Sequence, residues 1–235
     1  MSLDKKKYWK KVNLLEDFFR SRLKHHRDKI YEIIFSKIEF NEKKIIDIGS
    51  TPDLDDHHNT LLHKIKTNDK ITCLSNFDCS ILKKINPNFE IIKGDGLKTN
   101  FKDNSFDIVH SSATIEHVGN ENNQNEFIKE CLRISKKTVI ITTPNRYFPI
   151  DFHTKIPFIH FLPKKIHRKL LKLTKNHFFA KEENLNLLSY KDFKKYLEKS
   201  NISNISNISN ISNFEILEYK IFFMTSNLIL IINKN

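Results

Sequence analysis

The sequence predicts an α/β protein built on a doubly wound, mostly parallel seven-stranded sheet that finishes in a C-terminal antiparallel hairpin. Short apolar segments alternate with helix-compatible segments over the first 143 residues, and strands connected through helices are parallel. Glycine or small polar residues directly follow these apolar segments, which is typical of strands that end at a ligand-binding edge. The last two apolar segments are separated by only a short turn, so they are predicted to pair as a hairpin.

Residues 8–40 are predicted to form amphipathic helices, because apolar side chains recur every three or four positions between Lys, Arg and Glu. Basic amphipathic helices can lie on an anionic membrane surface. We expect these helices to cover the sheet instead, and peripheral membrane contact is the less favoured alternative.

Five strands are predicted within residues 44–143, which form the core of the fold. Their content of isoleucine and valine favours β-structure. Pro87 ends the helix before the third strand, and Pro144 ends the fifth strand. The predicted strands cover residues 44–48, 71–74, 90–93, 106–110 and 138–143, and the helices between them cover residues 59–65, 80–85 and 125–134.

The last third of the chain departs from this alternation. Residues 144–180 carry four prolines among aromatic residues and histidines, and they are predicted to form an insertion over the C-terminal edge of the sheet. Residues 201–212 repeat Asn-Ile-Ser four times. A period of three fits neither a strand nor an α-helix, so this run is predicted to be a loop. It separates a helix over residues 192–198 from the final strands over residues 214–220 and 228–233.

All 235 residues are predicted to form one domain. Its parts are the N-terminal helices, the core, the insertion, and the C-terminal helix with its strand pair. They cover residues 1–43, 44–143, 144–180 and 181–235.

The composition predicts a cytoplasmic protein. The apolar runs are too short to cross a bilayer, the first residues lack a secretory pattern, and the three cysteines have the spacing of free thiols. The net charge of +12 comes from lysines spread along the whole chain, so a nucleic-acid partner is not expected. These patterns leave the oligomeric state open.

Glycines and short polar residues stand at the ends of the first four predicted strands. The carboxyl ends of parallel strands meet at one edge of a sheet, so these residues are predicted to line a ligand site there. They are Asp47, Gly49 and Ser50 at the first strand, Ser75 and Asn76 at the second, Asp95 and Gly96 at the third, and Ser111 and Ser112 at the fourth.

Several motifs resemble one enzyme family in their order and spacing. They are "IIDIGS", "GDG", "FKDNSFDIVHSSATIEHVG" and "VIITTPNR" within residues 44–146, followed by "FEILEYK…NLILIINK". The chain is similar to the class I S-adenosylmethionine-dependent methyltransferases, in the group that includes the ubiquinone and menaquinone methyltransferases. This resemblance implies a Rossmann-like methyltransferase fold, S-adenosylmethionine as cofactor, and a small-molecule methyl acceptor such as a lipid-linked, aromatic or sugar precursor.

The resemblance also implies roles for single residues. Asp47 and Gly49, with Ser50, would shape the pocket for the methionine end of the cofactor. Asp95, with Gly96, would bind adenine, and Ser111 and Ser112 would border the transferred methyl group. An acidic residue commonly binds the ribose in this family, and Ser75 or Asn76 takes that place here.

Two other functions fit some of the same residues. The absent ribose acid and the single glycine after the first strand would also suit a relative that binds or scaffolds without catalysis. The positive charge would suit methylation of RNA or protein, although the motif after the fifth strand, "TTPNR", is unlike those that methylate nucleobase amines.

Histidine is the usual proton acceptor near neutral pH, and His117 is the first candidate because it follows the fourth strand. His110, His153 and His160 are the next candidates, and each of the four could instead be structural. The aromatic residues of the insertion could line an acceptor pocket or pack a lid. They are Phe152, Phe158, Phe161, Phe178 and Phe179.

One cluster of acidic residues and histidines invites interpretation as a metal site. His58 and His63 are five positions apart, which misses the four-residue spacing that places two ligands on one helical face. An acidic loop before a helix is the preferred interpretation, and no metal ligands are predicted. The cluster comprises Asp53, Asp55, Asp56, His57, His58 and His63.

Overall fold

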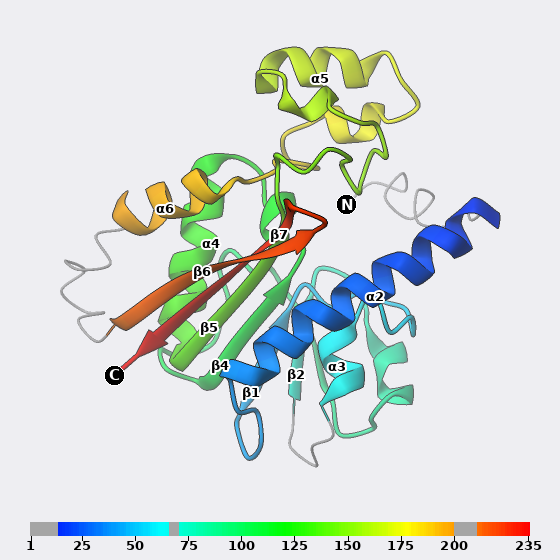
Figure 1. The fold of residues 1–235 in the computed structure, drawn as a ribbon. Coiled ribbons are helices and arrows are strands. Elements are labelled where there is room, and N and C mark those ends of the chain that lie inside the picture. The colour runs from blue at the N-terminus through cyan, green and yellow to red at the C-terminus, as the bar shows by residue number, and fades with distance from the viewer. Residues whose placement is uncertain (1–13, 66–70, 200–210) are drawn as a thin grey trace.

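The computed structural model describes residues 14–65, 71–199 and 211–235. It confirms the predicted fold class. One seven-stranded sheet has the strand order β3-β2-β1-β4-β5-β7-β6 (Figure 1). The five parallel strands are β1 (Ile45–Ile48), β2 (Ile71–Ser75), β3 (Glu90–Lys93), β4 (Phe106–Ser112) and β5 (Ser135–Pro144). The hairpin strands β6 (Ile211–Ile221) and β7 (Met224–Lys234) pair antiparallel to each other, and β7 pairs antiparallel to β5.

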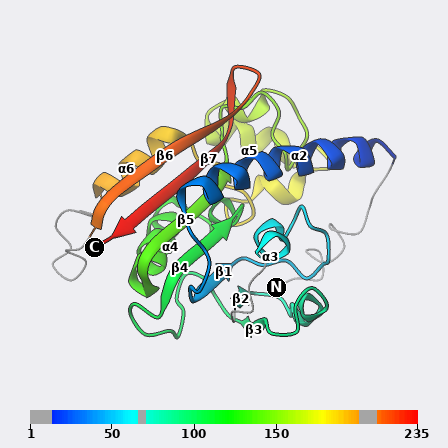
Figure 2. The same cartoon turned by 60° about the horizontal axis from the view of Figure 1, so that its bottom comes forward.

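Helices cover both faces of the sheet (Figures 1 and 2). On one face lie α2 (Leu14–Lys37), α3 (Thr60–Lys64) and the short 3-10 helix η1 (Ser80–Lys84), and on the other lie α4 (Glu121–Ile134) and α6 (Tyr190–Lys199). The residues of β1 and β2 are all buried, because a parallel sheet is covered on both sides. This explains why those strands read as largely apolar runs.

The N-terminal helix packs on the sheet, as expected for its described part. Tyr31 and Ile34 of α2 are buried in one cluster with Ile45 of β1 and Leu61 of α3. These side chains are therefore not available to a membrane surface. No helix in the described part of the chain is long and apolar enough to span a bilayer.

The segment predicted as an insertion forms a small lobe beyond the carboxyl ends of the strands, at the top of Figure 1. It contains η3 (Ile159–Phe161), α5 (Lys164–Lys172) and η4 (His177–Ala180). Leu171, Phe179 and Leu185 belong to its own apolar cluster, which is separate from the two clusters that flank the sheet. The lobe therefore has a core that can hold its polar residues in place over the sheet edge.

Several element boundaries differ from the predicted ones. Helix α4 begins at Glu121 instead of residue 125, because the Asn120 side chain accepts a hydrogen bond from the Asn123 backbone N–H and caps the helix. Strand β5 begins at Ser135, directly after α4. Of the Asn-Ile-Ser repeat, residues 201–210 lie outside the described residues, and Ile211 begins β6.

Candidate active site

The turns that leave the first four parallel strands are joined to one another by hydrogen bonds. The backbone N–H of Gly49 donates to the carbonyl oxygen of Leu74 at 2.8 Å, and the N–H of Gly94 donates to that of Ser75 at 2.9 Å. The Ser111 hydroxyl donates to the carbonyl oxygen of Ile48 at 2.8 Å. The turns that carry Gly49, Ser75 and Ser111 are therefore joined at one edge of the sheet.

Two glycines allow this close approach. Gly49 has φ +96°, and a Cβ there would lie 2.0 Å from Oγ1 of Thr114. At Gly96 a Cβ would lie 2.8 Å from Ile48 and 3.0 Å from Phe127. Both positions thus require glycine, the first because of its backbone conformation and the second because of side-chain packing.

Asp47 is buried near α2 in a chain of hydrogen bonds. Its Oδ1 lies 2.6 Å from Nδ1 of His110, and its Oδ2 accepts from the Ser50 hydroxyl at 2.6 Å. Nε2 of His110 lies 2.9 Å from the Tyr31 hydroxyl. Burial raises the pKa of Tyr31, so this hydroxyl stays protonated and can donate to His110. Asp47 therefore holds the loop after β1 through Ser50, and His110 has both ring nitrogens engaged in the core.

The loop after β2 contains a carboxylate that sequence reasoning missed. Strand β2 ends at Ser75, which is buried and accepts a hydrogen bond from the Phe77 N–H at 3.2 Å, whereas Asn76 is exposed. Asp78 follows three residues after the strand, and its carboxylate accepts hydrogen bonds from the backbone and the hydroxyl of Ser80. These hydrogen bonds lower the pKa of Asp78, so it is ionised near neutral pH. Its signal in the sequence is the turn-forming Asp-Cys-Ser run before η1.

The remaining predicted residues differ in their access to a ligand. Asp95 is exposed, and its Oδ1 accepts a hydrogen bond from the Leu97 N–H at 2.9 Å. Ser111 is fully buried. Ser112 is half-buried and hydrogen-bonded to Thr142 at 2.9 Å. The structure thus leaves Asp95 and Ser112 reachable by a ligand, while Ser111 joins β4 to β1.

His117 lies beside two further titratable side chains above the ends of β4 and β5. It belongs to η2 (Ile115–His117) and its Nδ1 lies 2.6 Å from the carbonyl oxygen of Asn184, to which it donates. The ring centroids of His117 and His153 are 4.9 Å apart. Glu116 has no exposed surface, and its Oε2 accepts from the Thr143 hydroxyl at 2.9 Å.

Burial and neighbouring charges have opposite effects on the pKa values of Glu116 and His153. Burial raises the pKa of Glu116, and the charge of His153 only partly offsets this effect. Burial lowers the pKa of His153, but the hydrogen bond and charge of Asp151 and the charge of Glu116 outweigh it, so the pKa is raised. Sequence reasoning named His117 and His153 but gave no role to Glu116 or Asp151.

The aromatic residues of the insertion divide into two sets. Phe179 is buried in the core of the lobe and packs edge-on against His153, with ring centroids 5.6 Å apart. Phe158 and Phe161 are exposed and contact each other. Phe179 therefore supports the histidine cluster by packing, while the exposed pair lies on the surface of the lobe.

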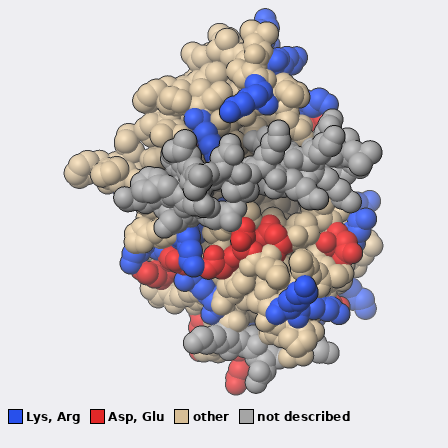
Figure 3. Space-filling view, turned by 90° about the vertical axis from the view of Figure 1, so that its right-hand side faces the viewer, with Lys and Arg blue, Asp and Glu red and all other residues tan. Residues whose placement is uncertain are grey.

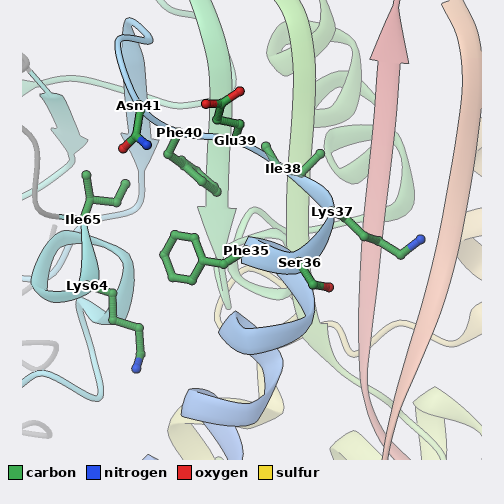
Figure 4. Close-up of a pocket in the computed structure, with 9 residues that line it drawn as sticks. All are labelled: Phe35, Ser36, Lys37, Ile38, Glu39, Phe40, Asn41, Lys64 and Ile65. Atoms are coloured by element: carbon green, nitrogen blue, oxygen red, sulfur yellow. The ribbon is translucent and has the colours of Figure 1, made fainter.

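Two cavities in the described part of the chain lie away from the carboxyl ends of β1–β4. A pocket of about 530 Å³ lies between the end of α2 and the end of α3, near the start of β1 (Figure 4). It opens at the opposite edge of the sheet from the predicted ligand site. A cavity of about 10 Å³ lies within the lobe, and its lining includes Arg146, His160, Lys164, His167 and Arg168.

Acidic side chains gather in a band across the middle of the face seen from the right of Figure 1, below the insertion lobe (Figure 3). Such a surface attracts a cationic ligand and repels phosphate groups.

Comparisons with known proteins concern part of the sequence and the fold. A family model described as a methyltransferase domain matches residues 73–142, which run from β2 to β5. No curated protein matches the sequence.

Solved structures share the fold at low sequence identity. Magnesium protoporphyrin IX methyltransferase from Synechocystis, solved with bound SAH, is 11% identical, with 96% of this chain and 89% of that chain covered and a TM-score of 0.57. A Thermotoga maritima methyltransferase, described as a possible histamine N-methyltransferase, is 16% identical over 94% and 96% of the two chains, with a TM-score of 0.55. A Methanosarcina mazei methyltransferase is 15% identical over 86% and 96%, with a TM-score of 0.51.

Proposed function

Since residues 73–142 match the methyltransferase domain and the chain has the class I S-adenosylmethionine-dependent methyltransferase fold, we propose that it transfers the methyl group of S-adenosylmethionine to a small-molecule acceptor. The observation that carries this proposal is the joined edge formed by the turns after β1–β4. There Gly49 has a positive φ, and backbone hydrogen bonds link the turn after β1 to β2 and the turn after β3 to the end of β2.

The residues at this edge fit the cofactor. Thr51 lies in the loop after β1, and its backbone N–H donates to the Asn59 side chain at 3.0 Å, which fixes the loop. The carboxylates of Asp78 and Asp95 are exposed, and they can accept hydrogen bonds from the ribose hydroxyls and the adenine amine of the cofactor.

The proposed contacts follow the order of the strands. Gly49 and Ser50 bind the methionine end, while Asp47 holds their loop from beneath through its hydrogen bond with Ser50. Asp78, together with Ser75 and Asn76, takes the ribose side. Asp95 and Gly96 take the adenine side, and Ser112 lies toward the methyl group, with Ser111 fixing β4 to β1 behind it.

When bound, the cofactor supplies a methyl group on a sulfonium, and the acceptor attacks it in line. The chain contributes mainly alignment, and such positioning can lower the barrier by roughly 7–11 kcal/mol. An oxygen or nitrogen acceptor must also lose a proton. His117 is the proposed catalytic residue, because its Nδ1 donates to the carbonyl of Asn184 and a neutral imidazole then carries its lone pair on Nε2.

Calorimetry with S-adenosylmethionine tests the cofactor site. We expect saturable binding by the whole chain, weakened on the order of tenfold or more in Asp95→Ala and in Asp78→Ala, since a hydrogen bond to a charged group contributes about 1.5–3 kcal/mol. Asp103→Ala is the matched control, because this exposed carboxylate pairs with Arg133 near the start of β4. Absence of binding at millimolar cofactor would overturn the proposal.

A non-catalytic relative that only binds the cofactor is separated by a second measurement. Incubation with labelled cofactor and a fractionated cell extract is expected to place label in a small molecule. Label that never leaves the cofactor in the presence of any fraction would support the scaffold alternative.

A further inference from the structure

The cluster above β4 and β5 contains the ligand set of a metal site. Glu116, His117 and His153 each offer one ligand atom, and these atoms all lie within 4.8 Å of one another. Nε2 of His153 lies 3.8 Å from Oε1 of Glu116. We propose that these three side chains bind one divalent transition-metal ion.

The second layer of contacts already orients all three side chains. Nδ1 of His117 donates to the carbonyl oxygen of Asn184 at 2.6 Å, and Nδ1 of His153 lies 3.0 Å from the carboxylate of Asp151. The Thr143 hydroxyl donates to the other oxygen of Glu116 at 2.9 Å. Metal-bound histidines almost always donate their second N–H to a carbonyl or carboxylate in this manner. These contacts orient each ring through Nδ1, so Nε2 is the nitrogen that would bind the ion.

The elements that carry these contacts are themselves fixed. The Asn186 N–H donates to the carbonyl of Glu116 at 2.7 Å, and the Asn186 amide donates to the carbonyl of Gly119 at 2.9 Å. Oδ2 of Asp151 accepts from the N–H and the hydroxyl of Thr154 at 3.1 and 2.7 Å. The ligands thus come from rigid neighbours, which is the condition for a preorganised site.

Burial and charge at Glu116 supply the second line of evidence. The side chain of Glu116 is fully buried, and its Oε1 has no hydrogen-bond partner among the described residues. A buried carboxylate oxygen without a partner is costly. A divalent cation held between Glu116 and the two histidines would supply the missing partner of Oε1.

The donor set indicates the class of ion. Two imidazoles and one carboxylate suit Zn²⁺, Fe²⁺, Mn²⁺ or Co²⁺, whereas Mg²⁺ and Ca²⁺ prefer oxygen ligands. Ions of the first class hold ligands at about 2.0–2.2 Å, so the three side chains need to close around the ion. The His153 side chain retains 12% of its exposure while Glu116 has none, so the open side of the site is the histidine side.

The site deepens the proposed function, and its role in catalysis rests on that function. An ion held here would bind an acceptor hydroxyl and lower its pKa, so that the proton could leave to water. With the ion bound, His117 is a ligand and not the proton acceptor, whereas without it His117 keeps the role proposed above. The sequence alone predicted no metal ligands, because the third ligand is 36 residues from His117 in the sequence. Binding of the ion itself does not require the cofactor.

Titration of the chelator-treated whole chain with Co²⁺, followed by visible absorption, tests the site. We expect one equivalent to bind and Zn²⁺ to displace it. Glu116→Gln and His153→Gln are expected to weaken binding at least about tenfold, the scale seen even for second-layer changes. His58→Gln is the matched control, because Asp55, His57 and His58 form the other group of candidate ligands in the described part of the chain.

Two measurements on the wild-type chain do not depend on whether the variants fold. They are the NMR spectrum of its Co²⁺ form and the binding of Co²⁺ and Zn²⁺. The wild-type Co²⁺ form should show two exchangeable, hyperfine-shifted N–H protons in its NMR spectrum, from Nδ1 of His117 and Nδ1 of His153. Failure of millimolar Co²⁺ and Zn²⁺ to bind would overturn the proposal. Binding that is lost in His58→Gln and kept in His153→Gln would also overturn it.

Calorimetry with S-adenosylmethionine on the same samples separates the metal site from the proposed function. If metal binding is absent while cofactor binding is intact, only the metal site is contradicted.

Discussion

At the scale of single residues, the histidines of this chain differ because their immediate neighbours differ. His110 is buried between Tyr31 and Asp47 and links α2 to the loop after β1. His153 is partnered by Asp151, which outweighs burial and raises its pKa. His167 lies in the small cavity of the lobe, where its Nε2 has no hydrogen-bond partner among the described residues. Identical side chains therefore serve different purposes at three places in the same fold.

The titration of His167 gives a test at this scale. Burial lowers the pKa of His167 to about 4, with His160, Arg146 and Arg168 adding to the effect and Asp151 opposing it. The unfolded chain therefore binds the extra proton below pH ~6.5 while the folded chain resists it until pH ~4. The contribution of His167 to stability should be greatest above pH ~6.5 and fall by up to about 3 kcal/mol as the pH drops through this window. Urea denaturation across this range should show a smaller fall in His167→Gln than in the wild type.

His177→Gln provides the control for this experiment, because His177 is exposed in the same lobe. If both variants change the pH dependence of the free energy of unfolding equally, the acid sensitivity does not come from His167.

At the scale of elements, the turn after β1 decides whether the edge of the sheet can form. Three hydrogen bonds fix this turn. The Gly49 N–H donates to β2, the Ser50 hydroxyl donates to Asp47, and the Thr51 N–H donates to the Asn59 side chain at 3.0 Å. These contacts tie β1 to β2 and to the start of α3. The turn can therefore keep its shape although it contains only one glycine.

Gly49→Ala tests that dependence. The added Cβ meets Thr114 at a backbone φ that L-residues rarely adopt, so we expect a loss of about 1–3 kcal/mol in the free energy of unfolding. Affinity for S-adenosylmethionine should fall with it. The measurement is urea denaturation with and without cofactor. At Gly94 a Cβ would lie 3.0 Å from a single Leu74 methyl group, so Gly94→Ala should cost less, and equal losses would contradict the argument.

At the scale of the whole molecule, charge is distributed unevenly. The chain carries 40 Lys and Arg against 28 Asp and Glu, yet Figure 3 shows a band of acidic side chains across the middle of one face, with Lys and Arg on either side. A net positive charge gives weak attraction to any polyanion, whereas an acidic band opposes the approach of a phosphate backbone to that face.

RNA binding is therefore expected to be weak and non-specific. Filter binding should show an affinity that falls steeply between about 50 and 200 mM salt, because it comes from counterion release. Labelled cofactor should transfer no methyl group to RNA. Tight binding that persists at the higher salt concentration, or methylated RNA, would support nucleic acid as the acceptor.

The sequence by itself determined the fold class and the edge that carries the candidate site. Apolar periodicity and turn residues act over a few neighbouring positions, so they predicted the five parallel strands, the terminal hairpin and the polar residues after each strand. They also placed Gly49 and Asp95 in turns, where the structure has them.

Only the tertiary structure decided which side chains meet. Asp47 contacts His110 across 63 residues, and His117 contacts the backbone of Asn184 across 67. Glu116 and Asp151 acquire a role only once the lobe folds back over β4 and β5. No local pattern encodes such contacts, because they depend on how far the insertion returns toward the sheet and on which faces of the elements are buried together.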